Sequence, residues 1–233
     1  MKLWKEDVIT AMERDPAARS FWEVFFTYNG VKALRMHRRA NRLYRHGHYF
    51  AARKVASRCV RLTGIDIHPA AEIGRRCFID HGVGVVIGET TVVGDDVLIY
   101  QGATLGGTGK DTGKRHPTVE DRVMISAGAK VLGPIIIGHD SKVGAGSVVL
   151  KDVPPFSTVV GVPGRVVKTN DIRVSDLDQI HVPDPILEEL RRLNDRIYTL
   201  EKQAGIHACR YTITVDSQEV KVEDSTDKPN DED

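Results

Sequence analysis

The sequence has few cysteines, no long apolar run and almost no net charge, and each of these features excludes a class of protein. The 3 cysteines are odd in number and scattered along the chain at Cys59, Cys77 and Cys209. We therefore expect neither a disulfide framework nor a zinc knuckle. No stretch is apolar and long enough for a membrane span or a signal peptide, and the opening residues carry charges throughout. These absences predict a cytoplasmic protein with reduced thiols and no membrane association.

The formal net charge of +1 hides an uneven distribution of charge along the chain. Residues 1–62 carry 14 Lys or Arg against 5 Asp or Glu, whereas residues 211–233 carry 2 against 8. In the basic stretch 35–54, apolar residues alternate with the charges as in an amphipathic helix, so we do not expect a nucleic-acid partner. The acidic end of the chain lacks the apolar content needed to order itself.

An aliphatic residue returns at every sixth position through the middle of the chain, a period that belongs to neither an α-helix nor a β-strand. A small residue often precedes it and a glycine often follows it, which suits short strands joined by tight corners. Three such hexads per coil would form a three-sided solenoid with the aliphatic side chains along its axis. The registers consist of Ile67, Ile73 and Ile79, then Ile87, Val93, Ile99 and Leu105, then Val119, Ile125, Val131, Ile137, Val143 and Val149.

These patterns divide the chain into four parts. We expect helices over residues 1–62, the solenoid over 63–168, a linker and helix over 169–205, and an acidic tail without regular structure over 206–233. Within the first part, Asp15-Pro16 suits an N-cap and first helical position. Asn29-Gly30 suits a helix stop or a hinge.

The predicted C-terminal helix opens at Asp184-Pro185, and its apolar residues are spaced by 4, 3, 4 and 3 positions. This is the spacing of a coiled-coil seam. A short helix of this kind could equally dock on its own solenoid, and the sequence leaves both alternatives open. The residues of the seam are Ile186, Leu190, Leu193, Ile197 and Leu200.

The hexad register is broken twice, each time beside a histidine. Two extra residues follow Asp80-His81, and eight extra residues form a loop that ends at His116-Pro117. Bulges and loops on a rigid scaffold often carry function. Asp66 lies fifteen residues before His81, so stacked coils could bring it close enough to orient the imidazole of a general base. The alternative is that Asp66 only decorates a corner.

Seven segments together resemble the bacterial serine O-acetyltransferases of the hexapeptide β-helix superfamily, over roughly residues 8–170. The resemblance implies a left-handed parallel β-helix (hexapeptide repeats) with an N-terminal α-helical region and a C-terminal helix. It also implies transfer of acetyl from acetyl-CoA to the L-serine hydroxyl in cysteine biosynthesis, without a metal. The segments are TGIDIHPAAEIG, DHGVGVVIGET, YQGATLGGTGK, GKRHPT, SAGAKVLGPIIIG, KVGAGSVVLKDVPP and GVPGRVV.

The resemblance also implies a role for individual residues. His81 matches the general base and Asp66 its orienting carboxylate. Asp80 matches the group that meets the serine amino group, and Arg115 with His116 matches the pair that holds the serine carboxylate. Further matches are Asp15 as a second substrate contact, whose alternative is helix capping, and Gly107, Ala127, Ala145, Lys142 and Arg165 as contacts of coenzyme A.

Members of this family assemble as trimers, or as dimers of trimers, with the active site between neighbouring prisms. We expect one of these assemblies here, and inhibition by L-cysteine, whose thiol replaces the hydroxyl of serine. The family member that docks into O-acetylserine sulfhydrylase uses a C-terminal isoleucine, whereas this sequence ends at Asp233. A charged terminus is costly to bury in an apolar pocket, so we expect no such complex.

Three other functions compete with this interpretation. A related prism enzyme could acetylate a sugar, an antibiotic or homoserine. A prism-shaped carbonic anhydrase would need three histidines converging on zinc, but His116 follows the cationic Arg115 and His139 lies in an ordinary corner. A catalytically silent scaffold would have no use for Asp66, Asp80, His81 and Arg115 together.

Overall fold

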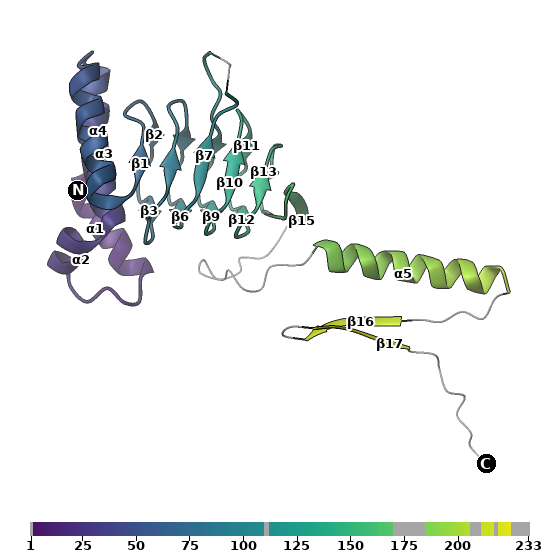
Figure 1. The fold of residues 1–233 in the computed structure, drawn as a ribbon. Coiled ribbons are helices and arrows are strands. Elements are labelled where there is room, and N and C mark those ends of the chain that lie inside the picture. The colour runs from purple at the N-terminus through teal and green to yellow at the C-terminus, as the bar shows by residue number, and fades with distance from the viewer. Residues whose placement is uncertain (1, 110–111, 170–184, 206–210, 217–218, 225–233) are drawn as a thin grey trace. The chain divides into compact units, whose positions relative to one another are not determined.

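The computed structural model describes residues 2–109, 112–169, 185–205, 211–216 and 219–224 of the chain (Figure 1). The chain divides into two compact units, Met1–Val182 and Pro183–Asp233. Within the described residues, no helix is both long and apolar enough to cross a membrane.

Four helices form the N-terminal part of the first unit. Ser20 caps the second of them, because its hydroxyl accepts a hydrogen bond from the Glu23 amide at 3.3 Å. The last helix ends at Gly64, which adopts the left-handed conformation at φ 72° that favours glycine. The helices are α1 (Leu3–Arg14), α2 (Phe21–Thr27), α3 (Asn29–Arg45) and α4 (Tyr49–Thr63).

One sequence-based expectation about these helices is wrong and another is confirmed. Asp15 is the C-cap of α1 and does not open a helix; its carboxylate instead accepts the Ala17 amide hydrogen in a local turn. The hinge expected at Asn29-Gly30 is present, because α2 ends at Thr27, Tyr28 is extended and α3 begins at Asn29. A side chain at Gly30 would overlap the Ile79 carbonyl oxygen, so glycine is needed here for close packing of α3 on the prism.

Three parallel sheets form the sides of a left-handed β-helix, and each side stacks one short strand per coil (Figure 1). The first sheet contains β1 (Asp66–Ile67), β4 (Val86–Ile87), β7 (Thr104–Gly106), β10 (Lys130–Leu132) and β13 (Val148–Val149). The second contains β2 (Glu72–Ile73), β5 (Val92–Val93), β8 (Thr118–Val119) and β11 (Ile136–Ile137). The third contains β3 (Phe78–Ile79), β6 (Leu98–Ile99), β9 (Met124–Ile125), β12 (Lys142–Val143), β14 (Ser157–Val160) and β15 (Arg165–Thr169), the last of them antiparallel to β14.

The aliphatic registers fill the axis of the prism. Ile67 pairs with Ile87 and Ile87 with Leu105, and these side chains are at most 3% exposed. Both register breaks are absorbed outside this core, because Leu105 still pairs with Val131 across the eight-residue insertion. Each coil therefore buries the apolar edge of the next, as a solenoid requires.

Helix α1 lies along the edge between the second and third sheets and is held there by ion pairs. Glu6 pairs with Arg75 at 2.8 Å, and Arg14 pairs with Asp96 at 3.1 Å. Farther along this edge, Arg122 pairs with Asp140 at 2.7 Å. We call these residues, with Arg76, the ionic edge; its charges are used in packing.

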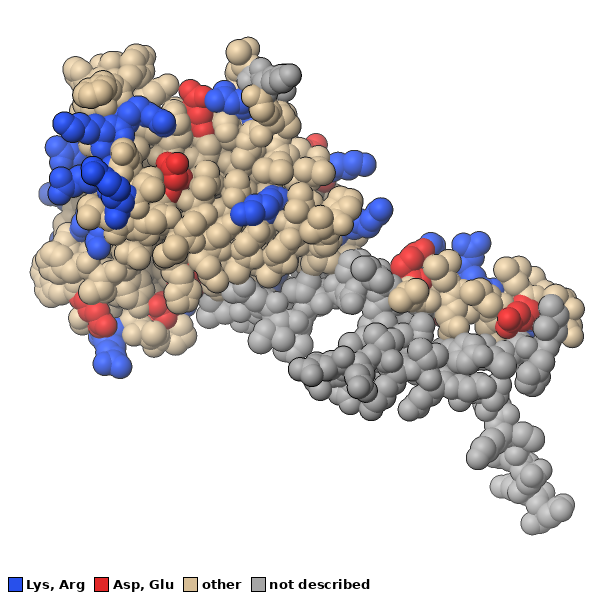
Figure 2. Space-filling view, viewed as in Figure 1, with Lys and Arg blue, Asp and Glu red and all other residues tan. Residues whose placement is uncertain are grey.

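Another surface of the helical part carries an excess of positive charge. Lysine and arginine side chains gather there over α3 and α4 (Figure 2). On α4, Arg53, Lys54, Arg58 and Arg61 are all exposed. This surface fits the amphipathic pattern of the sequence, in which the apolar face of the helix packs on the prism.

The described residues of the second unit form one helix and a strand pair. Helix α5 spans Pro185–Gln203, so Pro185 occupies its first position as the sequence predicts. The strands β16 (Tyr211–Asp216) and β17 (Glu219–Asp224) pair in antiparallel fashion, where the acidic composition predicted no regular structure. The alternating Tyr211, Ile213 and Val215 supply the β-propensity that this prediction undervalued.

Candidate active site

His81 lies in a bulge at the edge between the third and first sheets. It follows β3 and adopts φ 53°, a left-handed conformation that is uncommon for residues other than glycine. The Gly82 amide donates to the Asp80 carbonyl oxygen at 2.5 Å and closes a tight turn. A Cβ at Gly82 would lie 2.5 Å from Ile65 Cδ1, so the turn can press against the preceding coil only because this residue is glycine. The His81 side chain is left exposed to solvent.

Asp66 is on the coil against which this bulge packs. The Gly84 amide donates to the Gly64 carbonyl at 2.9 Å, and the Asp66 amide donates to the Val85 carbonyl at 2.9 Å. Stacked coils therefore bring the two backbone segments together. In the described part of the chain, no hydrogen bond joins the Asp66 and His81 side chains. Both side chains are exposed at the same edge.

Two carboxylates, those of Asp80 and Asp15, interact electrostatically near His81. The Tyr28 hydroxyl donates to Asp15 Oδ2 at 2.6 Å, and the Ala17 amide donates to Asp15 Oδ1 at 2.8 Å. Burial raises the pKa of Asp80, and the charge of Asp15 raises it further, against the lowering effect of His81. Burial, the hydrogen bond to Asp15 and neighbouring carboxylates, including Asp80, raise the pKa of Tyr28 to about 12. Two carboxylates thus lie within electrostatic reach of one another, and a cation between them would relieve their repulsion.

Arg115 and His116 occupy a different edge, between the first and second sheets, and Thr90 holds them there. The Thr90 hydroxyl accepts hydrogen bonds from the Arg115 and His116 amides, each at 3.1 Å. The Thr90 amide donates to His116 Nδ1 at 3.2 Å. In the neutral ring the proton therefore resides on Nε2. Thr90, on the preceding coil, thus holds the end of the loop through its backbone and its side chain.

Burial determines the character of His116. Its side chain lies against Gly88, where any Cβ would overlap the ring, and the residue is 8% exposed. Burial lowers the pKa of His116, and the charge of Arg115 lowers it further. The Arg115 guanidinium forms an ion pair with Glu89, whose pKa is lowered by that hydrogen bond. This edge therefore presents a neutral imidazole beside a paired cation.

Sequence reasoning did not select Tyr28, Glu89 or Thr90 as site residues. Glu89 and Thr90 belong to the segment DHGVGVVIGET, so a signal was present in the motif. Tyr28 had no comparable signal, because its contact joins Asp15 at the end of α1 to the residue that follows α2.

The residues proposed to contact coenzyme A do not form one cluster in a single chain. Ala127 and Ala145 lie at the same edge as His81, where four left-handed glycines stack with a Cβ-to-Cα spacing of 3.5–4.0 Å. Gly107 lies at the other edge, where its Cβ would be 3.0 Å from His116 Nε2. Lys142 is on β12 and Arg165 on β15, both in the third sheet. The stacked glycines are Gly84, Gly102, Gly128 and Gly146.

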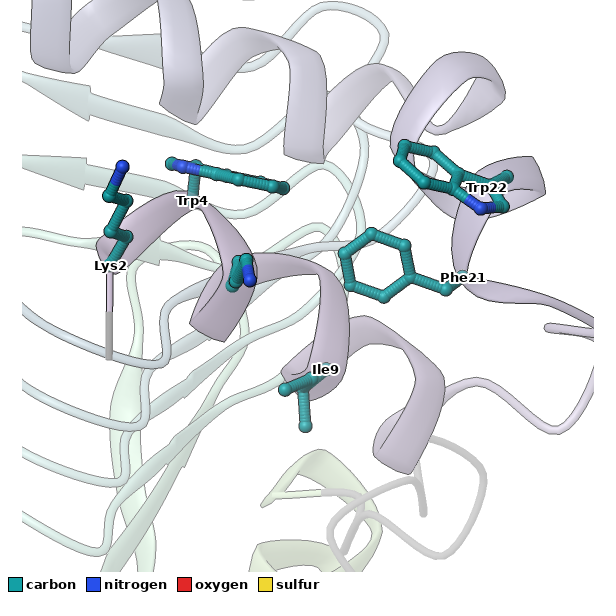
Figure 3. Close-up of a pocket in the computed structure, with 6 residues that line it drawn as sticks. Lys2, Trp4, Ile9, Phe21 and Trp22 are labelled. Atoms are coloured by element: carbon teal, nitrogen blue, oxygen red, sulfur yellow. The ribbon is translucent and has the colours of Figure 1, made fainter.

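A separate pocket of about 640 Å³ lies on the helical part, lined by Lys2, Trp4, Lys5, Ile9, Phe21 and Trp22 (Figure 3). The rings of Trp4 and Phe21 contact edge to face at 6.2 Å. None of the predicted site residues lines this pocket. Among the described residues, no group of three or more His, Cys, Asp or Glu side chains is arranged to hold a metal ion.

Comparison with known proteins identifies the repeat and the relatives. Residues 116–151 match the family described as bacterial transferase hexapeptide (six repeats). The chain is 53% identical over 203 residues to the serine acetyltransferase of Bacillus subtilis, covering 87% of this chain and 94% of that protein. The serine acetyltransferase of Staphylococcus aureus is 52% identical over 198 residues, covering 84% of this chain and 93% of that protein.

Solved structures agree with these relatives. The serine acetyltransferase of Vibrio cholerae superposes with a TM-score of 0.74 at 44% identity, covering 77% of this chain and 70% of that chain. The Brucella abortus enzyme, solved in complex with coenzyme A, superposes with a TM-score of 0.71 at 44% identity, covering 73% of this chain and 68% of that chain.

Proposed function

The chain belongs to the serine acetyltransferase family, and from this premise we propose that it acetylates L-serine with His81 as the general base. The observation that carries the proposal is the exposed imidazole of His81 beside the carboxylate of Asp80, which Asp15 also reaches electrostatically. A serine hydroxyl is a poor nucleophile at neutral pH, whereas an imidazole titrates in that range. Because L-serine also carries an ammonium group, a base that acts on its hydroxyl must lie near a negative charge.

The chemical step transfers one acetyl group directly. His81 takes the proton of the serine hydroxyl as the oxygen attacks the carbonyl carbon of the thioester. The new C–O bond forms, the C–S bond breaks, and the imidazolium returns its proton to the departing thiolate of coenzyme A. Asp66 orients the ring and stabilises the imidazolium. The support for this role is the packing of the two backbone segments against each other.

The zwitterionic substrate requires one anionic and one cationic subsite. Asp80 and Asp15 receive the serine ammonium group, and Tyr28 holds Asp15 in place through its 2.6 Å hydrogen bond. Arg115 and His116 receive the carboxylate, Arg115 as a fixed charge and His116 as a hydrogen-bond donor through Nε2. The Neisseria gonorrhoeae serine acetyltransferase, 44% identical, has been solved in complex with serine, which supports a serine subsite in this fold.

Two copies of the chain are needed to assemble this site. The anionic and cationic groups lie at different edges, separated by the width of the first sheet. About six extended residues cross that sheet, a span of roughly 20 Å, whereas serine spans on the order of 5 Å. We propose that the His81 edge of one protomer faces the Arg115 edge of the next around a homotrimer, or a dimer of trimers.

Coenzyme A lies along the His81 edge in this proposal. The stacked glycines carry no side chains and, with Ala127 and Ala145, leave the backbone uncovered along this edge, where a pantetheine arm fits. The row of stacked glycines leads to His81, so the thioester of acetyl-CoA would lie beside the base. Gly107 joins the site from the neighbouring protomer, and Lys142 and Arg165 supply charge for the nucleotide phosphates.

L-cysteine inhibits the enzyme by occupying the serine subsite. Its amino and carboxylate groups match those of serine, and a thiol replaces the hydroxyl. The support is a serine acetyltransferase of 39% identity solved in complex with cysteine, which superposes with a TM-score of 0.73.

A thiol-release assay with acetyl-CoA and a panel of acceptors tests the proposal. We expect coenzyme A to appear with L-serine and at much lower rates with homoserine, sugars or aminoglycosides. Equal or faster release with one of those acceptors would assign the prism to the alternative class of hexapeptide O-acetyltransferases.

A further inference from the structure

Helix α5 presents a row of large aliphatic side chains to solvent. Leu190 is 45% exposed, Leu193 42%, Ile197 53% and Leu200 60%. The spacing of 3, 4 and 3 places them on one face of the helix, as positions a, d, a and d of a heptad. In the described residues of this unit, no other element covers that face. Four exposed aliphatic residues in one row are more than scattered surface apolarity accounts for.

A second copy of the same helix matches this face in shape and charge. With Leu190 at position a, Arg196 falls at g and Glu201 at e of the next heptad. In a parallel pair, the g residue of one helix meets that e residue of its partner, so Arg196 meets Glu201 with opposite charge. Glu189 at g meets the neutral Asn194 in the same way. The register therefore opposes no like charges across the seam.

The exposed apolar face of α5 also gives the helix a reason to associate. In proteins, most helical stability comes from packing of an apolar face rather than from intrinsic propensity. The ion pair from Arg192 to Glu189 at 2.6 Å, on the surface of α5, is exposed and adds little. Burial of the aliphatic row against an identical row would supply the missing contact.

We propose that α5 of one chain pairs in parallel with α5 of other copies of this chain, as a coiled coil whose seam is Leu190, Leu193, Ile197 and Leu200. Parallel helices around one rotation axis are compatible with closed cyclic assemblies of any number of copies. The inference is independent of the proposed chemistry, because none of the site residues lies on α5.

Disulfide trapping in the full-length protein tests the pairing. Leu200→Cys is made in a Cys209→Ser background; Cys59 and Cys77 are buried. In a parallel seam, Leu200 meets Leu200 of its partner, within the distance that a disulfide spans. Mild oxidation should therefore convert this variant to a covalent dimer. The matched control Lys202→Cys, on the outward face two residues away, should stay monomeric on a denaturing gel.

A second pair of variants separates pairing from accidental collision. Ile197→Glu, added to the Leu200→Cys protein, places a charge in the seam and should abolish the disulfide. Lys202→Glu adds a carboxylate outside the seam and should leave it. The proposal is overturned if Leu200→Cys crosslinks no faster than Lys202→Cys, or if Ile197→Glu has no effect on the disulfide. Serine-dependent thiol release, measured on the same samples, reports on the proposed function separately.

Discussion

Two edges of the prism break the hexad repeat, and they differ in length, charge and the way they are held. At the His81 edge, two extra residues form a turn locked by Gly82, beside a group of carboxylates. At the Arg115 edge, a longer loop is held to the prism by hydrogen bonds to Thr90 and carries cationic and imidazole groups. The core is undisturbed at both breaks, since Ile87 and Leu105 are 1% and 0% exposed. A solenoid can therefore add chemistry at its corners while its axis stays fixed.

The largest expected effect is at the His81 edge. His81→Ala removes the base and should lower kcat by about 10²- to 10⁴-fold, the usual contribution of general base catalysis. The thermal unfolding curve should stay unchanged, because the side chain is exposed. His139→Ala, at the ionic edge, is the matched control and should retain full turnover. An unchanged kcat in His81→Ala would remove the imidazole from the mechanism.

At the Arg115 edge, the expected effect is on binding. Arg115→Ala should raise the serine KM by roughly tenfold to a hundredfold, because a hydrogen bond to a charged group contributes about 1.5–3 kcal/mol. Steady-state kinetics with varied serine measure this. Arg122→Ala removes a guanidinium from the ionic edge and should leave the serine KM unaltered. A fall in kcat alone at Arg115 would contradict the division between the two edges.

The pH dependence of serine binding distinguishes the edges further. The carboxylate of Asp80 must be ionised to bind an ammonium group, and burial raises its pKa. As pH falls through that raised pKa, the carboxylate gains a proton, and the serine KM should rise by about tenfold per pH unit below it. The loss of serine binding should begin at a higher pH than it would for an aspartate with an ordinary pKa.

Two variants identify the group responsible for this rise of the serine KM at low pH, which we call the acid limb. Asp80→Asn should remove the limb and raise the KM at every pH. Asp15→Asn should shift it to lower pH, because the charge of Asp15 raises the pKa of Asp80. A limb that is identical in all three proteins would assign it to another residue.

A smaller effect is expected where one residue acts through another. Tyr28→Phe deletes the hydrogen bond to Asp15 Oδ2 and should raise the serine KM about twofold to twelvefold, with kcat nearly constant, since a single hydrogen bond contributes about 0.5–1.5 kcal/mol. Tyr49→Phe, at an exposed position on α4, serves as the control. Equal kinetics for the two variants would show that Asp15 needs no such support.

The smallest effect belongs to the ionic edge, whose charges serve stability alone. Hydrogen bonding to Arg122 lowers the pKa of Asp140 from its ordinary value to about 2. This carboxylate therefore stabilises the fold above about pH 4, and the contribution is lost as pH falls toward 2. Asp140→Asn should cost about 1 kcal/mol or less at neutral pH, because such a surface pair is partly solvated. Urea unfolding at pH 7 and pH 2.5 should show the difference shrinking in acid.

Local patterns predicted the prism well because its order is local in sequence. A period of six determines which residues face the axis, and the coils pair Ile67 with Ile87 and Leu105 with Val131, as insertions of two and eight residues require. Local sequence patterns gave a wrong prediction where the same residue type is common in two different structural roles. Asp15 before proline reads as a helix start, but it ends α1 and binds Tyr28. Asn29-Gly30 correctly marks the change from α2 to α3, but the pattern did not show that Gly30 permits α3 to approach Ile79.

The sequence alone determined the coil, its two interruptions and the residue types at each corner, because apolar periodicity specifies burial directly. Only the tertiary structure decided that the two interruptions lie at different edges, that Thr90 tethers the Arg115 loop and that Tyr28 holds Asp15. These relations depend on which corners stack and which helix crosses them. That information resides in long-range packing, where a residue's neighbours in space are far from it along the chain.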